Sequence, residues 1–308
     1  MPKLLILSTG GALTIRRALS SRDDQPVMLR SDLVATIEEF TNVPGSHLTP
    51  PQVLALAQRI NTLRDTYDGI VVASGSDTLE ETAYLLDLLL PDGPPVVITS
   101  LPRLSSSGVG SPNGLQAAIT VAATPAAAQL GVLVVVDDTI YAAASVQAQF
   151  SQGSRMFTDP YGPLGRVEGE QANLWLRPIN RQYIAASRLV EPVDLIRIGQ
   201  GVDDRQLRHS IADQVAGIVI ETLGSGRVPP WWLPAIGDAI QRRIPVVAVS
   251  RAGAGGLGDE FGFVGAYHDL RKLGVIFAAN ISGIKARVKL MAALAVARSP
   301  AELRALFR

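Results

Sequence analysis

The sequence predicts a two-domain α/β fold, and three observations carry this prediction. Short β-branched runs alternate with amphipathic stretches, as in parallel strands joined by crossover helices. This alternation of strand and helix patterns is interrupted over residues 151–192 and then resumes. The length of 308 residues also exceeds what one average hydrophobic core holds. We therefore expect an N-terminal domain over 1–175, a linker over 176–192 and a C-terminal domain over 193–308.

Four β-branched runs predict the strands of the N-terminal domain, namely Leu4–Leu7, Gly69–Ala73, Pro95–Thr99 and Gly131–Val136. Apolar residues at helical spacing predict the intervening helices, one marked by Leu33, Ile37 and Phe40, one over Val53–Leu63 and one over Leu79–Leu90. Thr78 and Glu81 fit a capping box, so the third helix is expected to begin there. The span 151–192 lacks a helical period, and we expect a hairpin-like excursion that leads into the linker.

The C-terminal domain repeats the alternation. Its predicted strands are Val193–Ile198, Gly217–Glu221, Pro245–Ser250 and Gly274–Ala278, and its predicted helices cover about 203–215, 230–242, 283–296 and 300–307. Doubly wound parallel sheets bind ligands beyond the carboxyl ends of their strands. The chemistry is therefore expected in the N-terminal domain, in the loops that follow Leu7, Ala73, Thr99 and Val136.

Composition excludes several classes of function. The 28 basic and 28 acidic residues cancel, with no cationic cluster for nucleic acid. The chain has no cysteine and three histidines far apart in sequence, so we expect no disulfide, no metal site and no cofactor. The apolar runs are shorter than a signal peptide or a membrane span requires. We expect a cytoplasmic protein that binds a small molecule and neither nucleic acid nor membrane.

Two loops carry the residues with the clearest chemical potential. Ser8-Thr9-Gly10-Gly11 follows the first predicted strand, and Ser74-Gly75-Ser76-Asp77-Thr78 follows the second and opens a helix. Glycines allow close approach of a ligand, and a helix N-terminus offers N–H groups to a carboxylate. Asp77 would suit the ammonium group of an amino acid. A tight turn with ordinary helix caps explains the same residues without any ligand.

The segment Val71–Tyr84, which reads VVASGSDTLEETAY, closely resembles the HGTDTxEETAY segment of bacterial L-asparaginases. Thr9-Gly10-Gly11 resembles the start of the TGGT-I signature of that family. Further matches follow in order at Gly131–Val135 with Asp138, Tyr161–Gly165, Gly217–Glu221, Ser250-Arg251 and Lys285–Arg287. The resemblance covers nearly the whole chain. It implies a larger N-terminal, mostly parallel sheet flanked by helices and a smaller, flavodoxin-like C-terminal α/β domain.

The resemblance also implies an activity and an assembly. Enzymes of this family cleave asparagine to aspartate and ammonia through a threonine nucleophile, without a metal. They build each site at a dimer contact, which implies a homodimer or homotetramer. Two threonines, an aspartate and a lysine carry the reaction, and the lysine assists proton transfer and substrate holding.

This chain departs from the family at two of the reacting positions. Ala12 follows the Gly-Gly pair, where the family has its nucleophilic threonine. Ala148 stands at the lysine position, in a segment that reads SVQAQ instead of DVTKT. No lysine occurs between Lys3 and Lys272, so none from elsewhere in the N-terminal domain can substitute. We therefore predict that asparaginase turnover is weak or lost.

Other positions of the expected site are kept or changed mildly. Ser76 stands at the second threonine and keeps a hydroxyl, and Asp77 is retained. Thr14 could replace the missing nucleophile if Ala12-Leu13 is a two-residue insertion, so Thr14, Ser76 and Asp77 are the candidate catalytic residues. The substrate-binding serine of the family falls at Gly45, with Ser46 next to it. The candidate substrate-binding residues are Thr9, Gly10, Gly11, Gly45, Ser46, Gly75, Ser76 and Asp77.

Two hypotheses about function remain open at this point. The first is a working amidohydrolase that uses Thr14 or Ser76 with Asp77. The second is a catalytically inactive homologue that binds a small amino acid or acts as an oligomeric partner. A nucleotide-binding protein fits less well, because the glycine-rich loops match neither GxGxxG nor GxxxxGK[ST]. A serine hydrolase fits least, because no G-x-S-x-G elbow is present.

Overall fold

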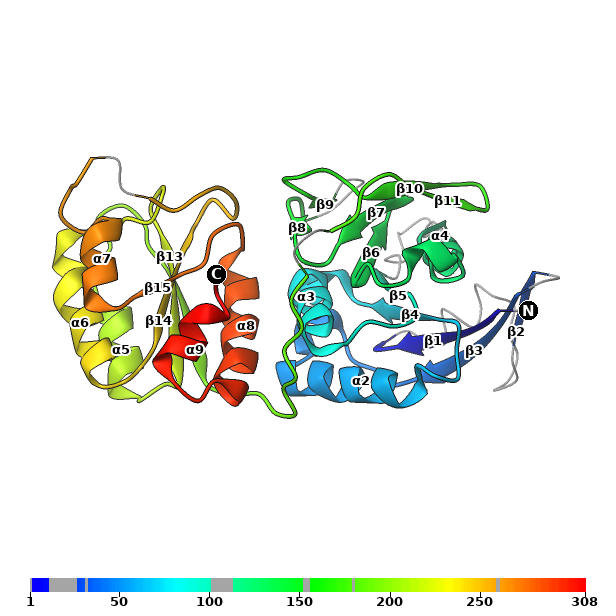
Figure 1. Cartoon of the computed structure of the whole chain (residues 1–308), viewed down its shortest axis with the longest axis horizontal. Coiled ribbons are helices and arrows are strands. Elements are labelled where there is room, and N and C mark those ends of the chain that lie inside the picture. Colours follow the sequence, from blue (N-terminus) through cyan, green and yellow to red (C-terminus); the bar gives the residue numbers. More distant parts are fainter. Residues whose placement is uncertain are drawn as a thin grey trace. The chain divides into compact units, whose positions relative to one another are not determined.

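The chain folds into two compact units, Met1–Tyr183 and Ile184–Arg308, and each has its own sheet (Figure 1). The structure is a computed structural model that describes residues 2–10, 27–30, 33–100, 113–151, 156–178, 181–258 and 261–308. The predicted α/β fold class with two domains is confirmed. None of the helices in these ranges is long and apolar enough to cross a membrane.

Unit 1 is built on a mixed sheet whose centre is parallel. Its described strands are β1 (Lys3–Ser8), β2 (Val27–Arg30), β3 (Leu33–Glu39), β4 (Gly69–Ser74), β5 (Val96–Ser100), β6 (Val132–Val136), β7 (Thr139–Ala142), β10 (Gly165–Glu168) and β11 (Gln171–Leu174). In the described part of the chain they form nine strands in the order β11-β10-β7-β6-β5-β4-β1-β3-β2. The five strands from β6 to β3 run parallel, and antiparallel strands continue the sheet on both sides.

Helices cover both faces of this sheet (Figure 1). They are α2 (Pro50–Leu63), α3 (Leu79–Leu89) and α4 (Asn113–Ala122), with short 3₁₀ turns η1 (Gly45–His47), η2 (Ser76–Thr78) and η3 (Pro125–Ala127). The helices α2 and α3 pack together on one face, and α4 packs on the other against β4, β5 and β6. A small antiparallel pair, β8 (Gln147–Ala148) and β9 (Phe157–Thr158), follows β7. The central strands are buried on both faces, which explains their continuous apolar runs.

Unit 2 has a parallel sheet in the order β12-β13-β14-β15. Its strands are β12 (Val193–Arg197), β13 (Gly217–Thr222), β14 (Val246–Ser250) and β15 (Ile276–Phe277). Its helices are α5 (Arg205–Ala212), α6 (Leu233–Gln241), α7 (Tyr267–Leu273), α8 (Gly283–Val296) and α9 (Pro300–Ala305), with the turn η4 (Pro230–Trp232) before α6. Side chains of α5, α6 and α7 enclose one core around Trp232, while α8 packs on the strands β12, β13 and β14.

Residues 33–39 correct one sequence prediction. Leu33 and Ile37 were expected on a helix, but β3 is a strand that pairs in parallel with β1. Burial alternates along it with a period of two, so that Leu33, Ala35 and Ile37 are buried. A spacing of four residues fits both a helix and a strand, and the β-branched residues of this segment favour the strand.

Two other elements differ from the sequence prediction. The helices α4 and α7 were not predicted, and α7 lies between two glycine-rich segments. The chain also turns back after β6 through Asp137 and Asp138, whose φ angles are 50° and 59°. Two consecutive positive φ angles are the geometry of a tight hairpin, so β7 runs antiparallel to β6.

Candidate functional site

The loops that follow β1 and β4 lie side by side at the carboxyl edge of the unit 1 sheet. The two strands are neighbours, and Ser8 pairs in register with Ala73. From β1 the sheet continues to β3 on one side, and from β4 it continues to β5 on the other. The order of strands therefore reverses between β1 and β4, which is where open α/β sheets form a ligand crevice.

Thr9 is part of the frame of this crevice. Its N–H donates to the carbonyl of Ala73 at 3.0 Å, and its hydroxyl donates to Ser74 Oγ at 3.0 Å. The side chain is 1% exposed. The hydroxyl of Ser8 donates to the carbonyl of Gly10 at 2.8 Å and closes the turn. The hydroxyl of Thr9 therefore joins the ends of two strands, and substrate binding by Thr9 stays a prediction.

Close backbone contacts bring the segment after β3 into the same place. A Cβ atom on Gly10 would lie 2.5 Å from the carbonyl oxygen of Val43. A Cβ atom on Gly75 would lie 2.6 Å from the nitrogen of Gly45 and 2.7 Å from its Cα. Such distances are shorter than any real Cβ contact, so Gly10 and Gly75 must be glycines for these loops to meet. Gly45 and Gly75, which the sequence placed in one site, are thus in direct contact.

Thr78 ties the same two loops together and corrects a second prediction. Its hydroxyl donates to the carbonyl of Gly45 at 2.9 Å. The helix α3 begins at Leu79 with Thr78 as N-cap, but no side-chain hydrogen bond caps it, so the expected capping box with Glu81 is not formed. A contact across 33 residues of sequence has replaced the local one. Thr78 is a residue of this region that the sequence placed only as a cap.

Ser76 and Asp77 lie on the turn η2, directly before α3. Ser76 is half-buried and Asp77 is exposed, and Ser46 is exposed on the neighbouring turn η1. Glu80 and Glu81 follow in the first turn of α3. An acidic first turn complements the positive end of the helix dipole. The hydroxyl of Ser76 and the carboxylate of Asp77 are therefore accessible to solvent beyond the end of β4.

The segment around Ala148 lies beside the same end of α3. The N–H of Ala148 donates to Glu80 Oε2 at 2.8 Å, and Glu80 is only 4% exposed. The pairing of β8 with β9 sets Ala148 opposite Phe157. The position that the resemblance assigns to a lysine therefore lies beside the first turn of α3, which directly follows the turn of Ser76, and carries a methyl group. Glu80 was not predicted as part of the region, although a carboxylate in a run of buried residues was a usable signal.

Gly11, Ala12 and Thr14 lie outside the described residues, so the geometry of the nucleophile position is not part of this site description. Among the residues that are described, no group of three or more His, Asp or Glu side chains could hold a metal ion. The described site offers hydroxyls, carboxylates and backbone N–H groups.

The fold and these loops define a two-unit α/β protein with closely packed, glycine-containing loops at the switch point of its larger sheet. Two family models match the chain, "Asparaginase, N-terminal" over residues 3–180 and "Glutaminase/Asparaginase C-terminal domain" over residues 192–307. The chain belongs to the bacterial L-asparaginase family.

Individual relatives agree with this assignment. The L-asparaginase of Bacillus licheniformis is 29% identical over 309 residues, which cover 95% of each chain. A protein of Deinococcus radiodurans named probable L-asparaginase is 31% identical over 318 residues, covering 100% of this chain and 97% of the relative. The glutaminase-asparaginase of Pseudomonas fluorescens is 28% identical over 281 residues, covering 88% and 76%. The similarity therefore extends through both units.

Proposed function

We propose that the crevice between β1 and β4 binds a small amino acid or its amide, and that hydrolysis of asparagine there is weak or absent. The observation that carries this proposal is Ala148 beside the first turn of α3. Its methyl group cannot hold a substrate or move a proton. The reaction of the family uses a lysine at this position.

No other lysine of unit 1 can replace it. Lys3 is the first residue of β1, at the amino end of the strand, whereas the crevice lies beyond Ser8 at the carboxyl end. Five residue steps along a strand separate the two by roughly 16 Å. The remaining lysines, from Lys272 onward, belong to unit 2 of the chain. Arginine stays protonated and is a poor proton carrier.

Binding is supported by groups that the chain has kept. The turn η2 and the first turn of α3 direct N–H groups to the crevice edge, where they suit a carboxylate. Asp77 supplies a negative charge for an ammonium group, and Ser76 supplies a hydroxyl. The glycine contacts fix both loops before any ligand arrives, which lowers the entropic cost of binding.

The direct test is ammonia release from asparagine and from glutamine. We expect the purified chain to be at least about 100-fold slower than the Bacillus licheniformis L-asparaginase in the same assay, because a positioned acid–base group contributes 10²–10⁴-fold. The variant with Ala12→Thr and Ala148→Lys together is expected to release ammonia faster than the unchanged chain. Equal rates for the unchanged chain and the Bacillus enzyme would instead favour a working amidohydrolase that uses Thr14 or Ser76.

Calorimetry with asparagine, aspartate, glutamine and glutamate tests binding separately from turnover. Asp77→Ala is expected to lower the affinity at least tenfold, because the ammonium group loses its charged partner. Asp65→Ala is the matched control, since Asp65 is an exposed carboxylate after α2. If Asp77→Ala binds as the unchanged chain does, the crevice has been placed wrongly.

We also propose that copies of the chain associate as a homodimer or homotetramer. The support is a set of large exposed apolar side chains in unit 1, Phe150, Tyr161 and Trp175, which are 56%, 59% and 59% exposed. Sedimentation is expected to give the mass of two or four chains, and a monomer at micromolar concentration would contradict it. The cytoplasm stays the predicted location, which cell fractionation checks.

A further inference from the structure

The two units carry opposite net charges, although the charges of the whole chain cancel. Residues 1–183 hold 12 lysines and arginines against 17 aspartates and glutamates, whereas residues 184–308 hold 16 against 11. Unit 2 therefore has a net positive charge, and unit 1 has a net negative charge. The net charge of a domain influences which partners approach it and bind it.

Four exposed cations of unit 2 lie where three of its helices end, and we call them the basic edge. They are Arg243 just after α6, Arg271 and Lys272 in the last turn of α7, and Arg304 in the last turn of α9. The three helix ends are far apart in sequence, so the chain contains no basic run that would predict this surface.

Contacts around Gly274 bring the three helix ends together. Gly274 is the C-cap of α7, and a Cβ atom there would lie 3.7 Å from the side chain of Ile240, in the last turn of α6. Arg304 Nη2 donates to the carbonyl of Gly274 at 3.4 Å, which places the end of α9 beside the end of α7. The cations on these helix ends therefore belong to one surface.

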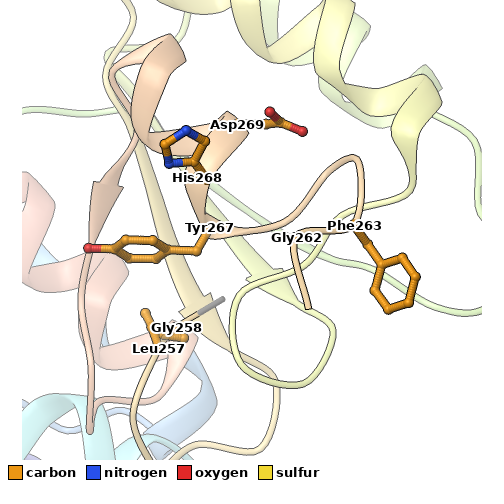
Figure 2. A pocket seen from close by; sticks show the side chains of 7 residues that line it. All are labelled: Leu257, Gly258, Gly262, Phe263, Tyr267, His268 and Asp269. Atoms are coloured by element: carbon orange, nitrogen blue, oxygen red, sulfur yellow. The ribbon is translucent and has the colours of Figure 1, made fainter. Parts of the chain in front are cut away.

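The carboxylates of the same three helices are used elsewhere. Asp269, in the first turn of α7, is turned away from the ring of Tyr267 (Figure 2) and accepts the N–H of Gly265 at 2.9 Å. Glu302, in the first turn of α9, accepts the N–H of Arg298 at 2.8 Å.

On α6, Asp238 pairs with Arg242, and the two groups are 3.0 Å apart. In the described part of the chain, the side chains of Arg243, Arg271 and Lys272 have no hydrogen-bond or ion-pair partner. The basic edge therefore keeps most of its positive charge.

Stabilisation of the helices explains only part of the basic edge. A cation in the last turn of a helix complements the helix dipole, and Arg304 does so directly through the carbonyl of Gly274. Arg243 has a φ angle of 63°, in the left-handed region where glycine is favoured. Like charges that lie close together also repel one another, and an anionic partner removes that repulsion.

The surroundings of the basic edge favour an acidic protein segment over a membrane or a nucleic acid. The large exposed apolar side chains that the structure describes in unit 2 belong to none of the three helix ends; they are Trp231, Phe261, Phe263 and Val264. The edge thus lacks side chains that insert into a membrane or stack on bases. The net negative charge of unit 1 also disfavours a long polyanion. An acidic segment is short, and arginine binds carboxylates through paired hydrogen bonds.

We propose that the basic edge binds an acidic segment of another protein, whose carboxylates lie on Arg243, Arg271 and Lys272. The proposal concerns unit 2 alone and does not depend on any ligand or activity of unit 1.

Two peptides with the same fluorophore test the proposal on the full chain. In anisotropy titrations at about 0.01 M ionic strength, where the Debye length is about 30 Å, hexaglutamate is expected to bind saturably and hexaglutamine is not. At about 1 M the Debye length is about 3 Å, and binding of hexaglutamate should be lost. Absence of saturable hexaglutamate binding would overturn the proposal. Tighter binding of hexathymidylate, which carries a similar charge on phosphates, would overturn it in favour of a nucleic acid.

Two double variants locate the binding. Arg271→Gln with Lys272→Gln removes two cations of the basic edge and is expected to weaken hexaglutamate binding about fivefold. Arg166→Gln with Arg177→Gln, on two exposed arginines of unit 1, is the matched control, because it changes the net charge equally. The control should bind as the unchanged chain does. Equal weakening by both double variants would mean that hexaglutamate responds only to net charge, and the basic edge would then not be its site.

Discussion

Replacing Arg181 by methionine is expected to lower the free energy of unfolding of unit 1 by about 3 kcal/mol. Nε of Arg181 donates to Asp87 Oδ1 at 3.1 Å, and the side chains of Arg181 and Asp87 are only 16% and 6% exposed. The guanidinium also donates to the carbonyl of Leu90 and pairs with Asp92. It thus holds the C-terminal end of α3 against the segment that ends unit 1.

The loss is large because the substitution leaves the buried carboxylate of Asp87 without its charged partner. Asp87 Oδ1 still accepts the N–H of Val132 at 2.8 Å, but one neutral donor does not replace a guanidinium. Burial raises the pKa of Tyr84, and the charge of the nearby Asp87 raises it further. The surroundings of Asp87 are therefore poorly solvating, and an unpaired carboxylate there is costly.

Urea-dependent hydrogen exchange of peptides from unit 1 measures this loss without interference from unit 2. Asp92→Asn is the control. Asp92 is 70% exposed, so its ion pair with Arg181 is expected to contribute less than about 1 kcal/mol to stability. Adding Asp87→Asn to Arg181→Met should recover part of the loss, since the amide keeps an acceptor for Val132 and carries no charge. If Arg181→Met alone is as stable as the unchanged chain, Asp87 is solvated and the expectation is wrong.

Replacing Lys289 by methionine is expected to stabilise unit 2 by about 2 kcal/mol at pH 7. Lys289 lies on α8 and is 8% exposed, and burial lowers its pKa to about 8 from the usual 10.5. That difference corresponds to roughly 3 kcal/mol against the charged form in the folded state. The ammonium group lies 5.0 Å from the ring centre of Phe307, and this cation–π contact offsets part of the cost.

The gain from Lys289→Met depends on pH in a defined direction. Below pH 8 both folded and unfolded chains carry the charge, and the full cost of burying it is present. Between pH 8 and 10.5 the unfolded chain binds more protons than the folded one, so the stability of the unchanged chain rises with pH. The advantage of the variant should therefore shrink over this window and nearly vanish above it.

Urea-dependent hydrogen exchange of unit 2 peptides at pH 7, with chemical denaturation at pH 7 and 10, tests this expectation. Methionine keeps the length of the side chain and can pack its sulfur on the ring of Phe307. Lys272→Met, on the exposed side of α7, is the control and should change stability little at either pH. A less stable Lys289→Met variant at pH 7 would mean that the ammonium group contributes net stability.

Much of the fold could be predicted because its strongest signals are local. The buried strands β1, β4 and β6 are largely apolar runs, and α2 and α3 follow a helical period. The helix predicted for the segment of β3 was wrong, because the spacing of Leu33 and Ile37 fits the period of a helix and that of a strand equally well. What decides between them is the partner strand β1, and a pairing partner is not written in the segment itself.

The candidate site shows the same limit. The glycines and the Ser76-Asp77 pair could be predicted from their loops and from the family resemblance. The hydrogen bonds from Thr78 to Gly45 and from Ala148 to Glu80 span 33 and 68 residues, so no local pattern predicts them. The sequence already offered a local interpretation of Thr78 as a helix cap, so nothing indicated a distant partner. Whether Thr14 takes part remains a prediction.

The contact between Gly45 and Gly75 limits how this region can change during evolution. With backbone against backbone, a side chain at either position forces both loops to shift, and Thr78 would carry α3 with them. Exposed neighbours such as Ser46 and Asp77 have no such constraint. A lineage that exchanges one ligand for another can therefore do so by single side-chain replacements on an inherited frame, whereas a new loop path would require several coordinated changes.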